Sequence, residues 1–323
     1  MGEAFLIAKV CKIIEMKLLS NSMLLLKLIS LLPNIKGKGR IFQFFKKAYL
    51  KKGNPIQTKH GKLGIFSIDL RSFAWEYYCN DTYDDNEISL ILSKLDADEI
   101  FIDVGANIGF YSVPVAQKIK NSNGKGKVIV FEPHPGNYEK LKHNIELNSL
   151  SEYIEMHMLG LSDSEALVNL VLREDFKAGS KTGNASIAIN DEYDQGYNTV
   201  QIKTQTLDKF MNSNEPDLKI GFVKLDIEGH EVNFLRGAQT FLKNHSPKIL
   251  LEVNKPYFEA SGVDACKEIG MLLPNYHFKN IASATSSTST SLSKNKANKI
   301  IPSKILSEVA INDINNIYCY VQE

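Results

Sequence analysis

The chain has 323 residues, of which 43% are apolar and 23% are charged, and its formal net charge is +1. These values exclude global disorder and suit either one large α/β domain with an extension or two small domains. The charge is unevenly spread, because residues 1–62 carry 12 Lys and one Arg against two Glu, a net charge of +11. This basic segment indicates contact with an anionic membrane or nucleic acid, or else a solvated, lysine-rich lead segment.

The cysteines are widely separated along the chain, and no histidine lies at metal-binding spacing from Cys11, Cys79, Cys266 or Cys319. We therefore expect neither a disulfide framework nor a zinc site. Free thiols are typical of the reducing cytosol, so we predict a cytoplasmic protein whose basic segment allows peripheral contact with a membrane.

Two basic helices are predicted near the N-terminus, at residues 4–32 and 40–47. Lysines interrupt the apolar start, and its longest uncharged stretch, residues 18–26, is about half of the roughly 20 residues that span a bilayer. We therefore expect no signal peptide and no membrane-spanning helix. The helices could lie on an anionic membrane through residues 1–52, or they could pack as a lid on the main domain.

Extended and helical stretches alternate through the rest of the chain, after an expected hairpin at residues 56–70. Core strands are expected at residues 100–103, 128–131, 153–158, 222–226, 248–253 and 316–321. Helices are expected at residues 86–95, 107–120, 138–148, 231–242 and 262–273. This alternation predicts an α/β fold with a doubly wound, Rossmann-like parallel sheet.

Two segments depart from this alternation. Helical periodicity is absent between residues 166 and 206, where short apolar runs and polar turns predict an antiparallel insertion. Residues 283–293 are almost wholly Ser, Thr and Ala, which is typical of a flexible loop. We assign residues 1–53 to a basic, helical N-terminal extension and residues 54–323 to the main domain.

The turn after the first core strand is a candidate cofactor-binding loop. Asp103 ends the strand, and Gly105 and Gly109 allow the backbone to turn tightly and approach a ligand. Such sheets bind ligands outside the carboxyl ends of their strands. A dinucleotide site favours Gly-x-Gly-x-x-Gly, whereas Asn107 stands here in place of the middle glycine. The loop therefore suits a cofactor without a phosphate, such as S-adenosylmethionine.

Polar residues at two further strand ends extend this candidate site. Glu132 ends the second core strand, where an acid can accept hydrogen bonds from ribose hydroxyls. Ser162 and Asp163 follow the third strand, where a polar side chain could face an adenine ring. The alternatives are an ordinary exposed Glu and a plain turn, since Ser and Asp are good turn formers.

Ionisable residues crowd at the end of the fourth core strand, where Asp226, Glu228, His230 and Glu231 follow one another closely. Burial of several acids costs stability unless they are paired or used. They could position or deprotonate an acceptor hydroxyl, bind a divalent metal, or begin a helix, whose N-terminus favours acids. We favour the first interpretation, expect no metal, and rank Asp226, which also lies nearest the cofactor, above Glu228 and His230 as a catalytic residue.

Residues 100–254 resemble the FkbM family of methyltransferases. The resemblance is carried by residues 101–109, 131–133, 144–148, 206–208, 223–231, 235–238 and 251–252. Its most specific part is Lys-x-Asp-x-Glu-Gly-x-Glu followed by Leu-Arg-Gly-Ala. The resemblance implies a seven-stranded methyltransferase sheet, with six strands parallel and one antiparallel, and S-adenosylmethionine as the cofactor.

The resemblance also implies O-methylation of hydroxyls on sugars, glycolipids or polyketides. The family's motifs correspond here to Asp103, Gly105, Asn107 and Gly109 for the cofactor loop, Glu132 for the ribose acid, and Asp226, Glu228 and Glu231 for the second acidic motif. His230 stands at a position that varies in the family, which puts a catalytic role for this histidine in doubt.

We therefore predict a methyltransferase that acts by in-line methyl transfer on a sugar- or lipid-linked hydroxyl. One alternative is an NAD-dependent oxidoreductase on the same fold, against which the missing middle glycine argues. Another is a catalytically inactive, membrane-associated methyltransferase-like protein, against which the intact glycines and acids argue. Nucleic acid is an unexpected partner, because neither Asn-Pro-Pro-Tyr nor Asp-Pro-Pro-Tyr follows the fourth strand.

Overall fold

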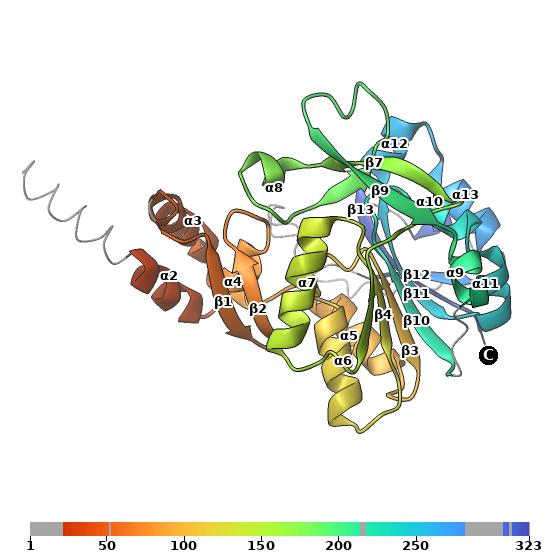
Figure 1. Cartoon of the computed structure of the whole chain (residues 1–323), viewed down its shortest axis with the longest axis horizontal. Coiled ribbons are helices and arrows are strands. Elements are labelled where there is room, and N and C mark those ends of the chain that lie inside the picture. The colour runs from red at the N-terminus through yellow and green to blue at the C-terminus, as the bar shows by residue number, and fades with distance from the viewer. Residues whose placement is uncertain (1–21, 52, 214–217, 282–305, 310–311, 323) are drawn as a thin grey trace, which may run out of the picture. The chain divides into compact units, whose positions relative to one another are not determined.

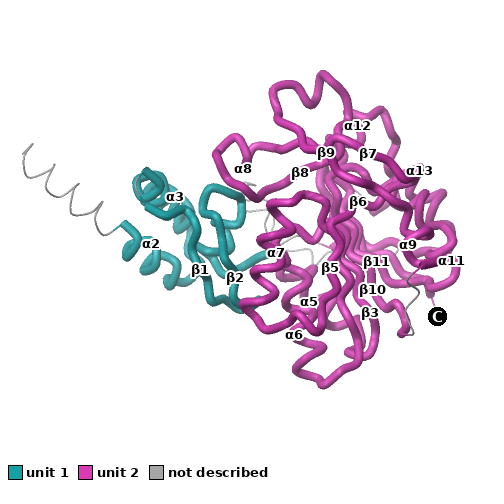
Figure 2. Tube along the Cα trace, viewed as in Figure 1, with its two compact units in different colours: residues 1–83 teal, residues 84–323 magenta. Residues whose placement is uncertain are grey.

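The computed structural model describes residues 22–51, 53–213, 218–281, 306–309 and 312–322. The chain forms two compact units, Met1–Tyr83 and Asp84–Glu323, which Figure 2 shows in different colours. The expected loop at residues 283–293 and the first part of the expected helix at residues 4–32 lie outside the described residues. The domain boundary that we expect after residue 53 stays a prediction.

The first unit combines helices with a hairpin. Its described elements are α2 (Ser22–Leu31), α3 (Lys38–Tyr49), β1 (Ile56–Gly61), β2 (Gly64–Asp69) and α4 (Trp75–Asn80). The antiparallel pairing of β1 with β2 confirms the expected hairpin. Phe42 of α3 stacks on Trp75, with ring centroids 5.7 Å apart. Among the described residues, no helix is long and apolar enough to cross a bilayer.

A seven-stranded mixed sheet forms the centre of the second unit (Figure 1). Its strands are β3 (Ile100–Val104), β4 (Val128–Phe131), β5 (Ile154–His157), β10 (Ile220–Leu225), β11 (Lys248–Asn254), β12 (His277–Ile281) and β13 (Ile314–Tyr320). Their order is β12-β13-β11-β10-β3-β4-β5. Only β13 runs antiparallel to the other six, which confirms the predicted sheet.

The central strands are buried along their whole length. Every residue of β3, β4 and β10 is buried, as expected for strands that helices cover on both faces. Lys224 of β10 pairs in register with Asp103 of β3, and Val104 pairs with Phe131 of β4. The carboxyl ends of these three parallel strands therefore meet at one edge of the sheet, where the candidate site residues follow them.

Helices cover both faces of this sheet. Figure 1 shows α5, α6 and α7 on one face and α9, α10, α11 and α13 on the other. Their bounds are α5 (Asp85–Lys94), α6 (Ser112–Asn121), α7 (Pro135–Leu147), α9 (Leu207–Ser213), α10 (Glu231–Arg236), α11 (Gln239–His245), α12 (Lys255–Ser261) and α13 (Ala265–Leu272). Neither α12 nor β12 was among the elements that the sequence predicts.

Two expected helices differ from the structure for a local reason. The helix expected from Asn107 begins only at Ser112, because Asn107 and Gly109 have φ values of 51° and 98°, which no right-handed helix allows. The helix expected over residues 231–242 is divided into α10 and α11. The division falls at Gly237, where a Cβ atom would lie 2.0 Å from the carbonyl oxygen of Ser162.

The insertion between the third and fourth core strands forms a second sheet. Its strands β6 (Gly160–Leu161), β7 (Ala166–Leu172), β8 (Ala185–Ile187) and β9 (Asn198–Gln205) lie in the order β6-β9-β7-β8. β7 pairs antiparallel with both β8 and β9, as predicted, whereas the short β6 pairs parallel with β9. A one-turn helix, α8 (Glu174–Lys177), follows β7.

Candidate active site

The loop after β3 approaches the end of β10 so closely that it requires glycine. Gly105 has a φ of 78°, and a Cβ atom on it would lie 2.1 Å from the carbonyl oxygen of Asp226. Asn107, at a φ of 51°, adopts the left-handed conformation that asparagine tolerates better than most residues. Its side-chain oxygen is buried and accepts no hydrogen bond from the described residues. The loop thus presents backbone and one amide oxygen at the sheet edge.

A buried lysine, Lys224 of β10, joins this loop to the acidic cluster. Its ammonium group lies 3.1 Å from a carboxylate oxygen of Asp226 and 3.7 Å from one of Asp103, and it donates a hydrogen bond of 3.0 Å to the Gly105 carbonyl. Burial lowers the pKa of Lys224, but the two carboxylates outweigh burial and raise this pKa above its ordinary value. Lys224 begins the Lys-x-Asp-x-Glu motif, but the sequence alone assigned it no role.

Asp103 and Glu132 form hydrogen bonds that stabilise the loop after β3. Ser112 Oγ donates a hydrogen bond of 2.5 Å to the carboxylate of Asp103. The Glu132 carboxylate accepts hydrogen bonds from the backbone N–H groups of Asn107, at 2.8 Å, and His134, at 2.9 Å. Burial raises the pKa of Glu132 to about 7 in spite of these donors. The side-chain amide of Asn137 is a third donor, at 3.4 Å, so of about four acceptor positions on the carboxylate one is left for a ligand hydroxyl.

The acidic turn after β10 is strained and shaped by its own side chains. Glu228 and Gly229 both have positive φ values, 56° and 93°. The Glu231 carboxylate accepts hydrogen bonds from the N–H groups of Ile227, at 3.0 Å, and Gly229, at 3.2 Å. Glu231 therefore fixes the turn and is buried beneath it, whereas Glu228 is only partly buried.

Burial shifts the proton affinity of this cluster. It raises the pKa of Glu228 to about 7, with a further contribution from the charge of Asp226, and it raises the pKa of Glu231 to about 8. Glu252, at the end of β11, also has a raised pKa, because of burial and then of the charges of Asp226 and Glu228. These acids therefore lie in one negatively charged region. The sequence spacing brings Asp226, Glu228 and Glu231 together, but not Glu252.

The third predicted position also lies beside the acidic turn. Ser162 Oγ lies 2.8 Å from His230 Nε2, and Asp163 accepts a hydrogen bond of 3.0 Å from the side chain of Asn233. Burial lowers the pKa of His230 to about 4, so its imidazole is neutral near pH 7. Ser162 and His230 thus link the end of β6 to the start of α10.

Asp84, which precedes β3, and Tyr111, which follows it, complete the surroundings of Lys224. Tyr111 donates a hydrogen bond of 2.9 Å to the carboxylate of Asp84, and the Lys224 ammonium lies 5.0 Å from the centre of the Tyr111 ring. Burial raises the pKa of Asp84. Neither residue belongs to a motif in the sequence, because Asp84 and Tyr111 are brought together only by the packing of the segments before α5 and α6.

The insertion and α12 together form an arginine–tyrosine cluster next to the acidic turn, with Tyr257 on α12. The Arg173 guanidinium lies 5.2, 5.2 and 5.4 Å from the ring centres of Tyr193, Tyr197 and Tyr257. It also lies 3.0 Å from the Asp194 carboxylate. Tyr257 hydrogen-bonds Glu228 and packs its Cβ where a side chain on Gly229 would lie. The cluster therefore flanks Glu228.

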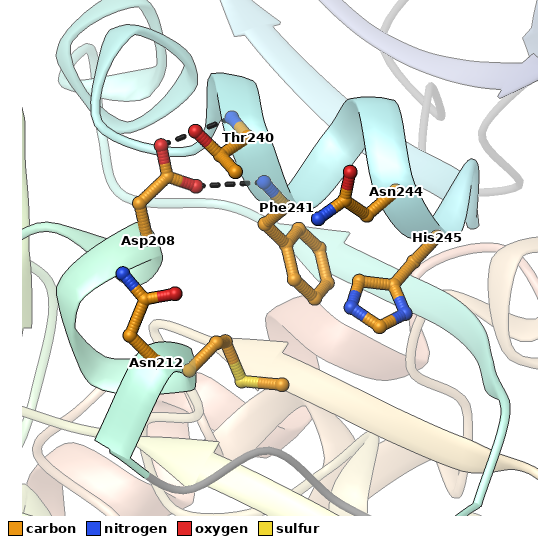
Figure 3. Close-up of a pocket in the computed structure, with 7 residues that line it drawn as sticks. Asp208, Asn212, Thr240, Phe241, Asn244 and His245 are labelled. Carbon is orange, nitrogen blue, oxygen red and sulfur yellow. Dashed lines mark hydrogen bonds between the residues drawn. The ribbon is translucent and has the colours of Figure 1, made fainter.

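A separate surface pocket lies between α9 and α11 (Figure 3). Its carboxylate, Asp208, accepts hydrogen bonds from the backbone N–H groups of Thr240, at 3.0 Å, and Phe241, at 2.7 Å, so it caps the start of α11. Its lining residues are Asp208, Met211, Asn212, Thr240, Phe241, Asn244 and His245. None of the predicted site residues lines it, and its one acid has a structural role.

Within the described residues, no cluster of His, Cys, Asp and Glu suits a metal ion.

Comparison with known proteins shows which family of proteins the chain resembles. Residues 103–280 match the family model of the methyltransferase FkbM domain. The hexuronic acid methyltransferase AglP of Haloferax volcanii is 27% identical over 157 residues, which are 49% of this chain and 57% of that protein. Methyltransferase 1 of Beauveria bassiana is 26% identical over 156 residues, which are 43% of this chain and 58% of that protein. The chain thus matches less than two thirds of the length of either relative.

Among solved structures, the crystal structure of a methyltransferase FkbM from Methylobacillus flagellatus is 14% identical, with a TM-score of 0.42. The alignment covers 94% of this chain and 60% of that one. The family model spans the cofactor loop, the acidic turn and the insertion.

Proposed function

Because this chain belongs to the methyltransferase FkbM domain family, we propose that it transfers a methyl group from S-adenosylmethionine to a hydroxyl of a sugar, a glycolipid or a related natural product. The observation that carries the proposal is the excess of acids around Lys224 at the sheet edge. Asp84, Asp103, Asp226, Glu228 and Glu252 influence one another there, with Lys224 as the central cation.

This charge balance fits S-adenosylmethionine. The cofactor carries a sulfonium and an ammonium group, and cations stabilise the ionised forms of neighbouring carboxylates. The fit also rests on the Gly105 backbone, which leaves no room for a side chain, and on the buried Asn107 oxygen, which can accept from an amine. A dinucleotide pyrophosphate would instead meet the carboxylates of Asp226 and Glu228 and be repelled.

We assign the parts of the cofactor to the residues at each strand end. Asp103, Gly105, Asn107 and Gly109 form the loop that approaches it, with Asp103 and Asp226 facing its positive groups. Glu132, through its remaining acceptor capacity, would bind the ribose hydroxyls. Ser162 and Asp163, which follow the short strand β6 after β5, would lie near the adenine end.

S-adenosylmethionine, when bound, supplies a methyl group on a positively charged sulfur. The protein must then align the acceptor oxygen and remove its proton. Glu228 is best suited to the proton, because its pKa is about 7 and only part of its side chain is buried. A base whose pKa lies near the working pH is ionised often enough and still binds a proton.

The other two catalytic candidates have supporting roles in this proposal. Asp226 is held by Lys224 at 3.1 Å, so it suits the electrostatic stabilisation of the cofactor. His230 is neutral and lies 2.8 Å from Ser162, so it orients the acidic turn relative to the end of β6. Glu231 holds the backbone of the turn by accepting hydrogen bonds from the N–H groups of Ile227 and Gly229, and so fixes the position of Glu228 in the turn.

The acceptor side is proposed to be the arginine–tyrosine cluster of the insertion. Tyrosine rings present an apolar face and a polar tip, which suits the faces and hydroxyls of a sugar. Tyr193 is 38% exposed and packs edge-on against Tyr257, with ring centroids 5.7 Å apart. The relationship to a hexuronic acid methyltransferase supports a carbohydrate acceptor.

The described cysteines are free thiols, which supports the expected cytoplasmic location.

Titration calorimetry with S-adenosylmethionine, S-adenosylhomocysteine and NAD tests the cofactor directly. We expect the first two to bind and NAD not to bind. Binding of NAD alone would overturn the proposal and favour the oxidoreductase. Release of S-adenosylhomocysteine during a screen of sugars and glycolipids then tests the reaction, and the position of the methyl group on the product shows whether oxygen is methylated.

A further inference from the structure

Helix α2 of the first unit carries leucines on two opposite faces. Leu26 and Ile29 are buried on its inner face. Leu24, Leu28 and Leu31 follow one another at helical spacing on the other face, and they expose 56%, 51% and 79% of their surface. An amphipathic helix normally turns polar residues outward, so this outer apolar face lacks an explanation within the fold.

The outer face of α3 combines apolar and basic residues. Phe42 is buried on its inner face, whereas Ile41 and Phe44 are exposed by 52% and 70%. Arg40 and Lys47 are exposed and lie on the same side of the helix as Phe44, at spacings of four and three residues. The mixture of large apolar side chains and long cations is typical of helices that lie at a membrane interface.

Contacts within the unit hold these two helices in place. Lys38 is buried, and its ammonium group donates hydrogen bonds to the carbonyl oxygens of Leu32, at 2.7 Å, and Ser30, at 3.3 Å, so α3 caps the end of α2. The Lys46 ammonium lies 4.5 Å from the centre of the Trp75 ring, which Phe42 also contacts. The exposed apolar residues therefore lie on helices whose inner faces are packed within the first unit.

The charge around this face selects its partner. The sequence holds ten Lys and Arg residues between positions 27 and 62, and it holds no Asp or Glu between positions 16 and 68. A second copy of the same face would meet like charges, which opposes self-association. An anionic phospholipid surface offers both the negative charge and the apolar interior that the face requires.

We propose that α2 and α3 dock on the surface of an anionic bilayer. Leu24, Leu28, Leu31, Ile41 and Phe44 enter the boundary between headgroups and acyl chains, and Lys27, Arg40 and Lys47 contact the lipid phosphates. The proposal rests on the first unit alone, so it holds whether or not the proposed methyl transfer is correct.

Flotation of the full-length protein with vesicles tests this surface. We expect the protein to float with vesicles of phosphatidylcholine and phosphatidylglycerol, and to float much less with phosphatidylcholine alone or at high salt. The pair Arg40→Gln/Lys47→Gln should weaken partitioning about 25-fold, since each cation near an anionic surface contributes about fivefold. The pair Leu28→Ser/Leu31→Ser should weaken it at least about tenfold.

Matched pairs in the second unit serve as controls. Leu167→Ser/Met271→Ser removes two apolar side chains that are 61% and 57% exposed, and Lys125→Gln/Lys243→Gln removes two exposed cations. Both control pairs should float like the wild type. The proposal is overturned if the wild type does not float with anionic vesicles, or if the α2 and α3 pairs float as well as their controls. A wild-type dimer that Leu28→Ser/Leu31→Ser dissociates, without flotation, would assign the face to self-association instead.

Discussion

Ionisable side chains at the carboxyl edge of the sheet have different electrostatic roles although they lie close together. Lys224 is a buried cation that forms ion pairs with Asp103 and Asp226. Glu228 lies in the same negative environment but is partly exposed and flanked by Tyr257, so its proton is exchangeable near pH 7. Lys224 therefore contacts two of these carboxylates directly, whereas Glu228 is placed to act as the base in the proposed reaction.

Glu228→Gln tests the proposed base. We expect kcat to fall about 10²- to 10⁴-fold, because proton removal by a side chain contributes that much, while the Kd for S-adenosylmethionine rises by a much smaller factor. In the wild type, kcat should rise with pH through about 7 as Glu228 loses its proton, and this rise should vanish in the variant. Glu259→Gln, an exposed acid on α12, is the matched control and should behave as the wild type.

Lys224→Met tests the buried ion pairs. Loss of Lys224 leaves the buried carboxylate of Asp103 and the partly buried carboxylate of Asp226 without their cation, which should lower the free energy of unfolding by about 3–5 kcal/mol. Urea denaturation measures this change. Lys219→Met breaks an ion pair whose lysine side chain is 70% exposed, and it should cost at most about 1 kcal/mol. Equal losses in the two variants would contradict the role given to Lys224.

At the scale of elements, the loop after β3 and the insertion are the two pieces that approach the acidic turn. The loop does so through backbone, since Gly105 lies against the Asp226 carbonyl. The insertion and α12 do so through side chains, since Tyr257 of α12 contacts both Arg173 of the insertion and Glu228. In the proposed function the loop binds the cofactor, and the insertion and α12 bind the acceptor.

Gly105→Ala tests the close approach of the loop. A methyl group 2.1 Å from a backbone oxygen, at a φ of 78°, must displace the loop from β10. We expect S-adenosylmethionine binding to weaken at least about 100-fold and the protein to lose stability, as calorimetry and urea denaturation would report. Gly270→Ala is the control, because no atom lies within 4 Å of the added group. It should stabilise α13 by up to about 1 kcal/mol.

Tyr193→Ala tests the acceptor wall once an acceptor has been found. The acceptor KM should rise about tenfold or more, while the Kd for S-adenosylmethionine stays constant, because Tyr193 belongs to the insertion and not to the cofactor loop. Tyr153→Ala, just before β5 at the opposite end of the parallel strands, is the matched control. An unchanged acceptor KM in Tyr193→Ala would remove this tyrosine from the acceptor site.

For the whole molecule, the buried acids make stability depend on pH. The folded pKa values of Glu132, Glu228 and Glu231 are about 7, 7 and 8, above their ordinary value of 4.5. Raised acid pKa values contribute stability that is present below the unfolded pKa and is lost as pH rises through the folded pKa. His134 and His230, with pKa values lowered to about 4, act in the opposite direction only below about pH 6.5.

Urea denaturation between pH 6.5 and 8 measures this effect. The free energy of unfolding of the ligand-free protein should fall by roughly 2 kcal/mol across that interval. Glu231→Gln should reduce the slope. Saturating S-adenosylmethionine should also reduce it, because a bound cation favours the ionised acids, so the cofactor should bind more tightly at pH 8 than at pH 6.5. A flat profile in the wild type would contradict the protonation of these acids.

Local patterns in the sequence determined the alternation of strands and helices, the antiparallel insertion and the acids at each strand end. The family resemblance added the mixed seven-stranded sheet and the one reversed strand. These features are predictable because apolar periodicity, glycine and chain order act over short distances. The candidate residues Asp103, Glu132, Asp226 and Glu228 were predicted for the same reason, since each lies at or just after the end of a core strand.

Only the tertiary structure decided what those residues contact. It placed Lys224 between two acids, turned Glu132 toward the N–H groups of Asn107 and His134, and brought Arg173 and Tyr257 to Glu228. It also divided the helix after the acidic turn at Gly237, against which Ser162 packs. Such contacts join residues far apart in the chain, and burial then sets their pKa values, so no local pattern in one sequence encodes them.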